Sequence, residues 1–310
     1  MKITITPRGF FKNGKEYIKI LQDKGYEVDY NDSGKSYTRE QFFEHCQGAA
    51  GVVCASEKVD KEFFDTHPEL KTIIKFGVGI DNIDVDYANS KNIFVGRCAG
   101  SNSRSVAEHA AALMFAASKN LYDGIYETKH SNWKKFSGFE LLGKTVGIIG
   151  FGAIGKHLAN ICNGLGMKIL CYDAFPIDQI LAEEYGAVIS DLETIYSESD
   201  FISVHVPLNE ETKGMISLQE MKKMKDSCIL INTARGGIIN EDDLYTALSE
   251  KYIKAAYFDV FSSEPPDWEN KLFKLDNFYL TPHMAASTTE ADVNCCRMAT
   301  EILLDRLGDE

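Results

Sequence analysis

A glycine-rich segment between an apolar run and a helix-like stretch constrains the fold more than any other part of the sequence. Residues 145–155 read TVGIIGFGAIG, and the chain continues as KHLANICNGLG before a second apolar run, KILCYD. An apolar strand, a glycine turn, a helix and another apolar strand form a βαβ unit, which requires parallel strands. The segment therefore predicts an α/β fold built on a parallel sheet.

The same alternation of strand-like and helix-like stretches runs through most of the chain. Short apolar runs near residues 2–6, 26–30, 51–55, 72–76 and 92–96 predict a small parallel sheet. After an alanine-rich helix at 105–120, longer apolar runs follow at 145–150, 168–173, 201–206, 228–232 and 254–260. Since 310 residues exceed what one core usually supports, we predict two Rossmann-like or flavodoxin-like domains, each a doubly wound parallel sheet. An amphipathic helix at 287–307 is expected to return to the first domain.

Composition excludes several classes of function. The net charge of −13 argues against a nucleic-acid or membrane-binding surface. The eight cysteines show no CxxC pair or zinc spacing, and several lie in apolar runs, so we expect reduced core cysteines and no metal. The N-terminal sequence has no signal peptide, and no apolar run is long enough to span a membrane. We therefore expect a cytoplasmic protein.

The glycine segment predicts a dinucleotide site. Gly150, Gly152 and Gly155 form a GxGxxG motif between a strand and a helix. Gly150 would allow the tight turn, Gly152 the approach of a pyrophosphate, and Gly155 close packing of helix on strand. Asp173 ends the next strand, where a carboxylate accepts hydrogen bonds from ribose and repels a 2′-phosphate. NAD is therefore favoured over NADP, whereas the alternative interpretation is a plain strand-to-helix turn.

Three further polar residues follow strand ends downstream of the glycine segment. Arg235 follows ILIN, Glu264 follows AAYFDV, and His283 follows the run ending at Leu280. The carboxyl ends of parallel strands are where open α/β sheets bind ligands. Each residue alone could be structural, but together they predict a catalytic group.

The whole set of motifs resembles the D-isomer-specific 2-hydroxyacid dehydrogenase family, in the branch that includes D-3-phosphoglycerate dehydrogenase. The resemblance runs from about residue 50 to the end and rests on seven segments: GVGIDNIDVDYA, SVAEHAAALM, LLGKTVGIIGFGAIG, HVPLNEETKGMI, NTARGGIIN, FDVFSSEPP and TPHMAAST. The first fifty residues match only in their rhythm of strands and helices.

The resemblance implies an NAD-dependent oxidoreductase that moves a hydride between nicotinamide and C2 of a D-2-hydroxy or 2-keto acid. Arg235 would bind the carboxylate and carbonyl oxygen of the keto acid. His283 would donate the proton in reduction and accept it in oxidation. Glu264 would hold His283 and favour its charged form, because a carboxylate neighbour stabilises an imidazolium.

The resemblance also implies contacts with the cofactor and the substrate. Beyond Gly150, Gly152, Gly155 and Asp173, the implied cofactor contacts are Ala153, Ile154, Val206, Pro207, Thr212, Thr233, Ala234 and Asp259. The implied substrate contacts are Ser56, Val78, Gly79, Asn102 and Arg235. A glycine turn is the alternative interpretation of Val78 and Gly79. The other histidines at 45, 67, 109, 130 and 157 are interpreted as structural, and His205 as lining the cofactor edge.

Family members interleave their domains, which implies a substrate-binding domain of residues 1–100 plus 284–310 and an NAD-binding domain of residues 101–283. The resemblance implies an active site in the cleft between these domains and a homodimer formed through the NAD-binding domain.

The sequence leaves the substrate open. Phosphoglycerate enzymes of this type hold the phosphate with an arginine after the third strand, and we place Cys54 at that position. We also expect the chain to lack the C-terminal regulatory domain that many serine-pathway enzymes carry. Phosphoglycerate and an unphosphorylated acid such as hydroxypyruvate, glyoxylate or lactate therefore both stay open.

Two other functions share this fold. C-terminal-binding-protein corepressors use it as an NAD-sensing interaction module and retain a similar polar set. Formate dehydrogenase pairs its histidine with glutamine, and Glu264 speaks against it.

Overall fold

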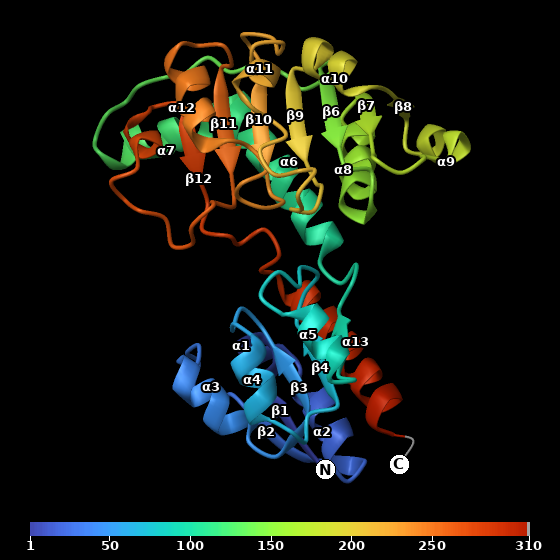
Figure 1. The fold of residues 1–310 in the computed structure, drawn as a ribbon. Coiled ribbons are helices and arrows are strands. Elements are labelled where there is room, and N and C mark those ends of the chain that lie inside the picture. The colour runs from blue at the N-terminus through green and yellow to red at the C-terminus, as the bar shows by residue number, and fades with distance from the viewer. Residues whose placement is uncertain (309–310) are drawn as a thin grey trace. The chain divides into compact units, whose positions relative to one another are not determined.

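The computed structural model describes residues 1–308 and divides into two compact units. Unit 1 contains Met1–Asn102 and Ser287–Glu310, and unit 2 contains Ser103–Ala286. Each unit holds one sheet in which every strand pair is parallel. The predicted fold class, two parallel α/β sheets, is confirmed (Figure 1).

Unit 1 has a five-stranded sheet in the order β2-β1-β3-β4-β5. Its strands are β1 (Lys2–Ile5), β2 (Glu27–Tyr30), β3 (Ala49–Cys54), β4 (Thr72–Lys75) and β5 (Phe94–Arg97). Its helices are α1 (Arg8–Asn13), α2 (Lys15–Asp23), α3 (Arg39–Cys46), α4 (Lys61–Thr66), α5 (Val85–Ser90) and α13 (Thr289–Leu307). The order reverses between β1 and β3, where ligands of such sheets bind.

The unit 1 sheet is apolar on both faces because helices cover both. Val53 of β3 packs with α2 and α13, whereas its neighbour Val52 packs with α3, α4 and α5 on the other face. Helix α13 comes from the end of the chain yet contacts β3 and β4 (Figure 1). The side chain of Thr288 caps it by accepting the amide hydrogen of Ala291.

Unit 2 has a seven-stranded sheet in the order β12-β11-β10-β9-β6-β7-β8. Its strands are β6 (Thr145–Ile149), β7 (Lys168–Tyr172), β8 (Ala187–Ile189), β9 (Phe201–Val204), β10 (Ile229–Asn232), β11 (Ala255–Phe258) and β12 (Phe278–Leu280). Its helices are α6 (Ser103–Lys119), α7 (Leu121–Lys129), α8 (Ala153–Gly164), α9 (Gln179–Glu184), α10 (Leu192–Glu198), α11 (Leu218–Met221), α12 (Glu241–Ser249) and the 3-10 turn η1 (Lys271–Lys274). The strand order reverses between β6 and β9.

The core of unit 2 also lies on both faces of its sheet. Ile148 packs on one face with α6 and α8, and its neighbour Ile149 packs on the other with α10 and α12. Successive strand residues point to opposite faces, so a sheet covered on both sides needs continuous apolar runs. This explains why the unit 2 strands stand out in the sequence.

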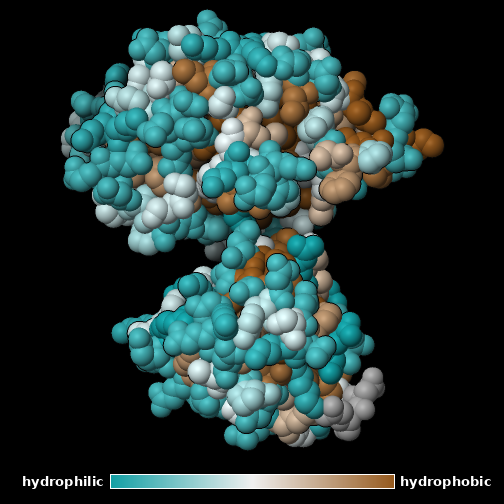
Figure 2. All heavy atoms as spheres, in the orientation of Figure 1, coloured by the Kyte–Doolittle hydropathy of each residue, from teal (hydrophilic) through white to brown (hydrophobic). Residues whose placement is uncertain are grey.

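One strand of unit 2 lies outside the clear sequence pattern. Strand β8 is a three-residue edge strand whose Val188 and Ile189 are exposed, and it is too short to stand out in the sequence. Figure 2 shows apolar side chains gathered at the end of unit 2 that carries β8 and α9.

All eight cysteines are free and buried, as predicted. Among the helices of residues 1–308, none is long and apolar enough to cross a membrane.

Candidate functional site

The glycine segment forms the turn from β6 into α8, beside the point where the strand order reverses. Gly150 has φ +100°, and a Cβ there would lie 2.7 Å from the carbonyl carbon of His205. A Cβ on Gly155 would collide with the carbonyl oxygen of Gly150. A Cβ on Gly152 would meet nothing within 4 Å. Two glycines are therefore required by the fold, and Gly152 alone faces open space.

The N-terminus of α8 offers unused hydrogen-bond donors to that space. Within residues 1–308, the amides of Ala153, Ile154 and Gly155 donate no hydrogen bond, and no side chain caps the helix at Gly152. Amides at a helix N-terminus, at the positive end of its dipole, bind phosphate well. The segment thus fits a pyrophosphate.

Asp173 follows β7 and reaches back to the glycine turn. One carboxylate oxygen accepts the amide of Phe151 at 2.7 Å, and the other accepts the amide of Phe175 at 3.1 Å. These bonds fix the carboxylate at the carboxyl edge of the sheet and leave each oxygen a further lone pair. A ribose diol fits an acceptor of this kind.

Residues after β9 and β10 line the same edge of the sheet. The Thr212 hydroxyl donates to the carbonyl of Pro207 at 2.6 Å and shapes the turn after half-buried Val206. The amide of Ala234 donates to Asn232 Oδ1 at 3.0 Å. The buried hydroxyl of Thr233 has no partner among the described residues. A buried hydroxyl is normally paired, so Thr233 fits contact with a ligand.

His283 and Glu264 form a direct pair. Nδ1 of His283 lies 2.6 Å from Oε2 of Glu264, and Oε1 of Glu264 accepts the amide of Phe261 at 3.0 Å. Burial alone would raise the pKa of Glu264, but the two hydrogen bonds and the charges of His283 and Arg235 outweigh it and lower the pKa. The carboxylate therefore stays ionised near neutral pH and accepts the Nδ1 proton. No hydrogen bond forms at Nε2 within residues 1–308, so that nitrogen can face a reactant.

Arg235 lies close to this pair. Its guanidinium is half-buried, and its charge contributes to the lowered pKa of Glu264. Nη1 donates to the carbonyl of Ala234 at 2.7 Å, and Asn232 Nδ2 donates to the carbonyl of Arg235 at 2.9 Å. The structure therefore brings Arg235, Glu264 and His283 together at the end of one sheet. Their catalytic roles stay predictions.

Asp259, a predicted cofactor contact whose role stays a prediction, is the acceptor of several hydrogen bonds in unit 2. Its fully buried carboxylate accepts hydrogen bonds from the amides of Met284 and Ala285 and from the hydroxyl of Thr281. His109 of α6 joins this group through Thr281. The sequence interpretation missed the contact because a histidine within a helix carries no local signal for a partner 172 residues away.

Unit 1 holds the other predicted substrate contacts. Val78 and Gly79 follow β4, and their amides donate no hydrogen bond to any described residue. Oδ1 of Asn102 is buried without a partner in residues 1–308. Ser56 is exposed in the loop after β3. Unpaired amides and a buried amide oxygen fit ligand contact, and the roles of these residues stay predictions.

The placement of a phosphate-binding position at Cys54 is wrong. Cys54 is the last residue of β3, is fully buried among the side chains of α3, α4 and α5, and burial raises the pKa of its thiol to about 12. A side chain there points into the core, so the exposed part of the loop begins at Ala55.

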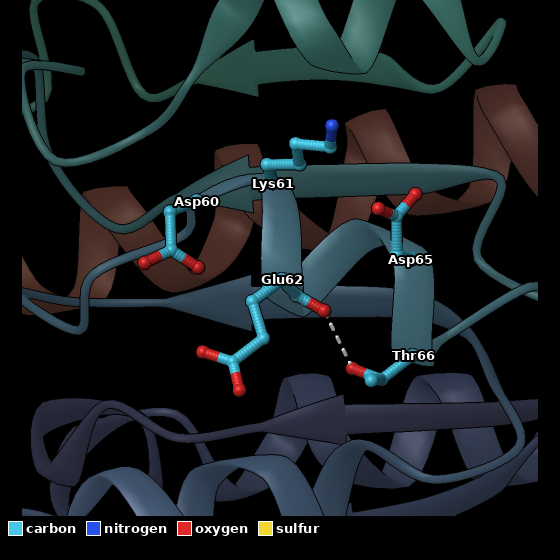
Figure 3. Close-up of a pocket in the computed structure, with 5 residues that line it drawn as sticks. All are labelled: Asp60, Lys61, Glu62, Asp65 and Thr66. Carbon is cyan, nitrogen blue, oxygen red and sulfur yellow. Dashed lines mark hydrogen bonds between the residues drawn. The ribbon is translucent and has the colours of Figure 1, made fainter.

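Two open hollows lie away from this group of residues. One of about 490 Å³ lies against α4 and is lined by Asp60, Lys61, Glu62, Asp65 and Thr66, with Thr66 donating to the carbonyl of Glu62 at 2.8 Å (Figure 3). The other, of about 390 Å³, lies beside the N-terminus of α12. In the described residues no group of three or more His, Cys, Asp or Glu could hold a metal ion. Neither hollow contains a predicted site residue.

Comparison with known proteins matches residues 111–285 to the NAD binding domain of the D-isomer specific 2-hydroxyacid dehydrogenases. A hydroxypyruvate reductase of Thermotoga maritima is 44% identical over 261 residues, which cover 83% of this chain and 84% of that protein. A D-3-phosphoglycerate dehydrogenase of Archaeoglobus fulgidus is 40% identical over 294 residues, covering 94% of this chain. This chain spans 55% of the length of that second relative.

Solved structures agree with these matches. A D-lactate dehydrogenase from Aquifex aeolicus, complexed with NAD and lactic acid, superimposes with a TM-score of 0.82 at 29% identity. The superposition covers 100% of this chain and 96% of that one. The chain therefore belongs to the D-isomer-specific 2-hydroxyacid dehydrogenase family, and its second unit contains an NAD-binding domain.

Proposed function

We propose that this protein is an NAD-dependent D-2-hydroxyacid dehydrogenase whose acid–base group is His283, held by Glu264, and whose carboxylate clamp is Arg235. The observation that carries the proposal is the 2.6 Å contact between His283 and Glu264 beside Arg235 within an NAD-binding domain. The bound nicotinamide supplies or accepts the hydride, and the protein supplies alignment and proton transfer.

His283 moves the proton. With Nδ1 directed to the ionised Glu264, Nε2 donates to the carbonyl oxygen of a keto acid in reduction and accepts the hydroxyl proton in oxidation. Glu264 keeps the imidazole in one orientation and stabilises its charged form. Arg235 binds the substrate carboxylate and stabilises charge on the oxygen at C2.

The substrate is proposed to be a short unphosphorylated 2-keto acid of the hydroxypyruvate or glyoxylate type. In the loop after β3, the first partly exposed side chain is Ala55, and the carboxylate of Glu57 folds back onto the Ala55 amide at 2.6 Å. The negative charge of Glu57 in this loop opposes phosphate binding, and the exposed Lys58 is paired with Asp60 at 3.2 Å. The amides of Val78 and Gly79 in unit 1, which donate to no described residue, are proposed as a further contact for the substrate.

A panel of 2-keto acids tests this function. Purified protein is assayed with hydroxypyruvate, glyoxylate, pyruvate, oxaloacetate and phosphohydroxypyruvate, each with NADH and with NADPH. We expect NADH to be preferred because of Asp173, and hydroxypyruvate or glyoxylate to give the highest kcat/KM. A preference for phosphohydroxypyruvate would overturn the substrate proposal and leave the reaction type intact.

Two variants separate an enzyme from a cofactor-sensing module. His283→Gln is expected to lower kcat by about 10²–10⁴-fold, the usual contribution of a general acid. Arg235→Gln is expected to lose most activity while NADH still binds. Tight NADH binding without turnover in the unchanged protein would instead favour the NAD-sensing module.

A homodimer is proposed to form through unit 2. Helix α7 has no buried residue and exposes Leu121, Tyr122, Ile125 and Tyr126. Apolar side chains gathered on one helix are commonly covered by a partner. Sedimentation should therefore give a dimer that Ile125→Glu dissociates, and a monomer in the unchanged protein would contradict this. A cytoplasmic location stays a prediction.

A further inference from the structure

The loop that carries His283 has a backbone conformation that must be held in place. His283 follows β12 with φ +49°, a left-handed value that a residue with a side chain adopts at an energetic cost. Its amide donates to the carbonyl of Asp259 at 2.8 Å and to that of Thr281 at 2.9 Å. The surrounding hydrogen bonds therefore determine where the imidazole points.

Asp259 is the centre of these bonds. Its side chain has no exposed surface, and one oxygen accepts the Thr281 hydroxyl at 2.5 Å and the Met284 amide at 2.9 Å. The other oxygen accepts the Ala285 amide at 2.8 Å. Three donors from residues 281–285 thus converge on one buried carboxylate, which fixes the loop on both sides of His283.

His109 completes the group from α6. Its Nε2 lies 3.0 Å from Oγ1 of Thr281 and 3.5 Å from Oδ1 of Asp259, and its side chain is largely buried. The single hydroxyl proton of Thr281 goes to the carboxylate at 2.5 Å, because the other possible acceptors among residues 1–308, Nε2 of His109 at 3.0 Å and the carbonyl of Phe258 at 3.3 Å, lie farther away and are weaker acceptors than an ionised carboxylate. Oγ1 must therefore accept from His109, so Nε2 of His109 carries a proton.

We propose that His109 is a positioning residue for the reaction: by donating through Nε2 to Thr281, it holds the Thr281–Asp259 pair and thereby the loop that orients His283. The chain of contacts is His109 to Thr281, Thr281 to Asp259, and Asp259 to the amides after His283. The Nε2–H group also lies 3.5 Å from the buried carboxylate of Asp259, whose other donors among residues 1–308 are one hydroxyl and two amides. This proposal rests on the proposed role of His283 as the proton donor.

Removing the donor should misplace His283 without emptying the cofactor site. In His109→Leu, Thr281 loses its donor, and we expect kcat with hydroxypyruvate to fall about 10- to 100-fold, the loss typical of a small misplacement. KM for hydroxypyruvate and Kd for NADH should stay within about twofold, because no binding contact changes. His109→Gln retains an N–H donor and should recover most of kcat. His157→Leu, at an exposed position on α8, is the matched control and should behave as the unchanged protein.

A double-variant cycle tests whether the two residues act as one chain. Thr281→Val removes the bridging hydroxyl, so the pair His109→Leu/Thr281→Val should lose no more kcat than the worse single variant. Additive losses, or full kcat in either single variant, would overturn the proposal. If His109→Leu does not fold, Thr281→Val, which removes the bridging hydroxyl, is compared with His109→Gln, which keeps an N–H donor. Equal kcat in these two variants would contradict the positioning role of His109.

The kcat values of His283→Gln and His109→Leu distinguish a failure of this proposal from a failure of the proposed function. Full kcat in His283→Gln would show that the proton donor is elsewhere, whatever His109 does. Loss of kcat in His283→Gln with unchanged kcat in His109→Leu would leave the proposed function standing and reject the role of His109.

Discussion

Both units are built on a parallel sheet, but they differ in the groups that lie where the strand order reverses. In unit 2, the turn after β6 leaves backbone amides without partners among residues 1–308 and open space beside Gly152. In unit 1, the loop after β3 is filled by side chains that bond to one another. A site made of backbone is marked by glycines in the sequence, whereas a site made of side chains is not.

The unit 1 loop is held from three directions. Glu57 accepts the Thr6 hydroxyl at 2.6 Å and the Ala55 amide at 2.6 Å. Asn82 donates to the carbonyl of Glu57 at 2.6 Å, and Lys75 donates to the carbonyl of Ala55 and to Asn82. These contacts join β1, β3 and the turn after β4, so the conformation around Ser56 depends on residues distant in sequence.

Glycine variants in unit 2 should give the largest effects and separate fold from binding. Gly155→Ala places a Cβ against the Gly150 carbonyl and should lower the free energy of unfolding by about 1–3 kcal/mol, typical of overpacking in a core. Gly152→Ala meets no atom within 4 Å, so the melting temperature should hold while NADH affinity falls at least about tenfold. Calorimetry with and without NADH measures both effects.

Gly164→Ala is the matched control for these variants. A Cβ at Gly164, at the end of α8, also meets nothing within 4 Å, so neither stability nor NADH affinity should fall. Unchanged NADH affinity in Gly152→Ala would contradict the claim that the backbone around Gly152 forms the cofactor site of unit 2.

A variant in unit 1 should affect substrate and spare the cofactor. Glu57→Gln replaces an acceptor oxygen with an amide donor facing either Thr6 or Ala55, and we expect KM for the keto acid to rise about tenfold, the cost of roughly one lost charged hydrogen bond. NADH affinity should not change. Glu69→Gln, at an exposed position in the same unit, is the control for the lost charge. If Glu57→Gln weakened NADH binding as much as it raised KM for the keto acid, the separate roles of the two units would be contradicted.

The smallest expected effect near neutral pH is a pH dependence at the reversal point of unit 2, which grows as the solution becomes acidic. Burial lowers the pKa of His205 to about 3, so the folded protein keeps this imidazole neutral where the unfolded chain, with a pKa near 6.5, binds a proton. His205 therefore costs stability as pH falls from about 6.5 towards 3, by at most about 1.4 kcal/mol per pH unit. His205→Gln should reduce the acid dependence of urea unfolding by up to one proton. If the free energy of unfolding of His205→Gln and of the unchanged protein depended on pH with the same slope, the lowered pKa of His205 would be contradicted.

The sequence predicts the repeating strands well because both faces of each sheet are covered, which requires continuous apolar runs such as those of β6 and β10. It misses β8, a three-residue edge strand with two exposed side chains. It assigns the phosphate-arginine position of related enzymes to Cys54, a buried residue, because the strand end cannot be located to one residue. It interprets His109 as structural because its partners come from β11 and β12. Of these features, the contacts of His109 depend on segments far apart in the sequence.

A crystal structure of the protein with NADH tests most directly whether the carboxyl end of the unit 2 sheet holds both the cofactor and the proton donor. We expect the pyrophosphate against the amides of Ala153 and Ile154, the ribose on Asp173, and the nicotinamide facing Arg235 and His283. A nicotinamide bound away from His283, or a His283 imidazole separated from Glu264, would contradict this expectation.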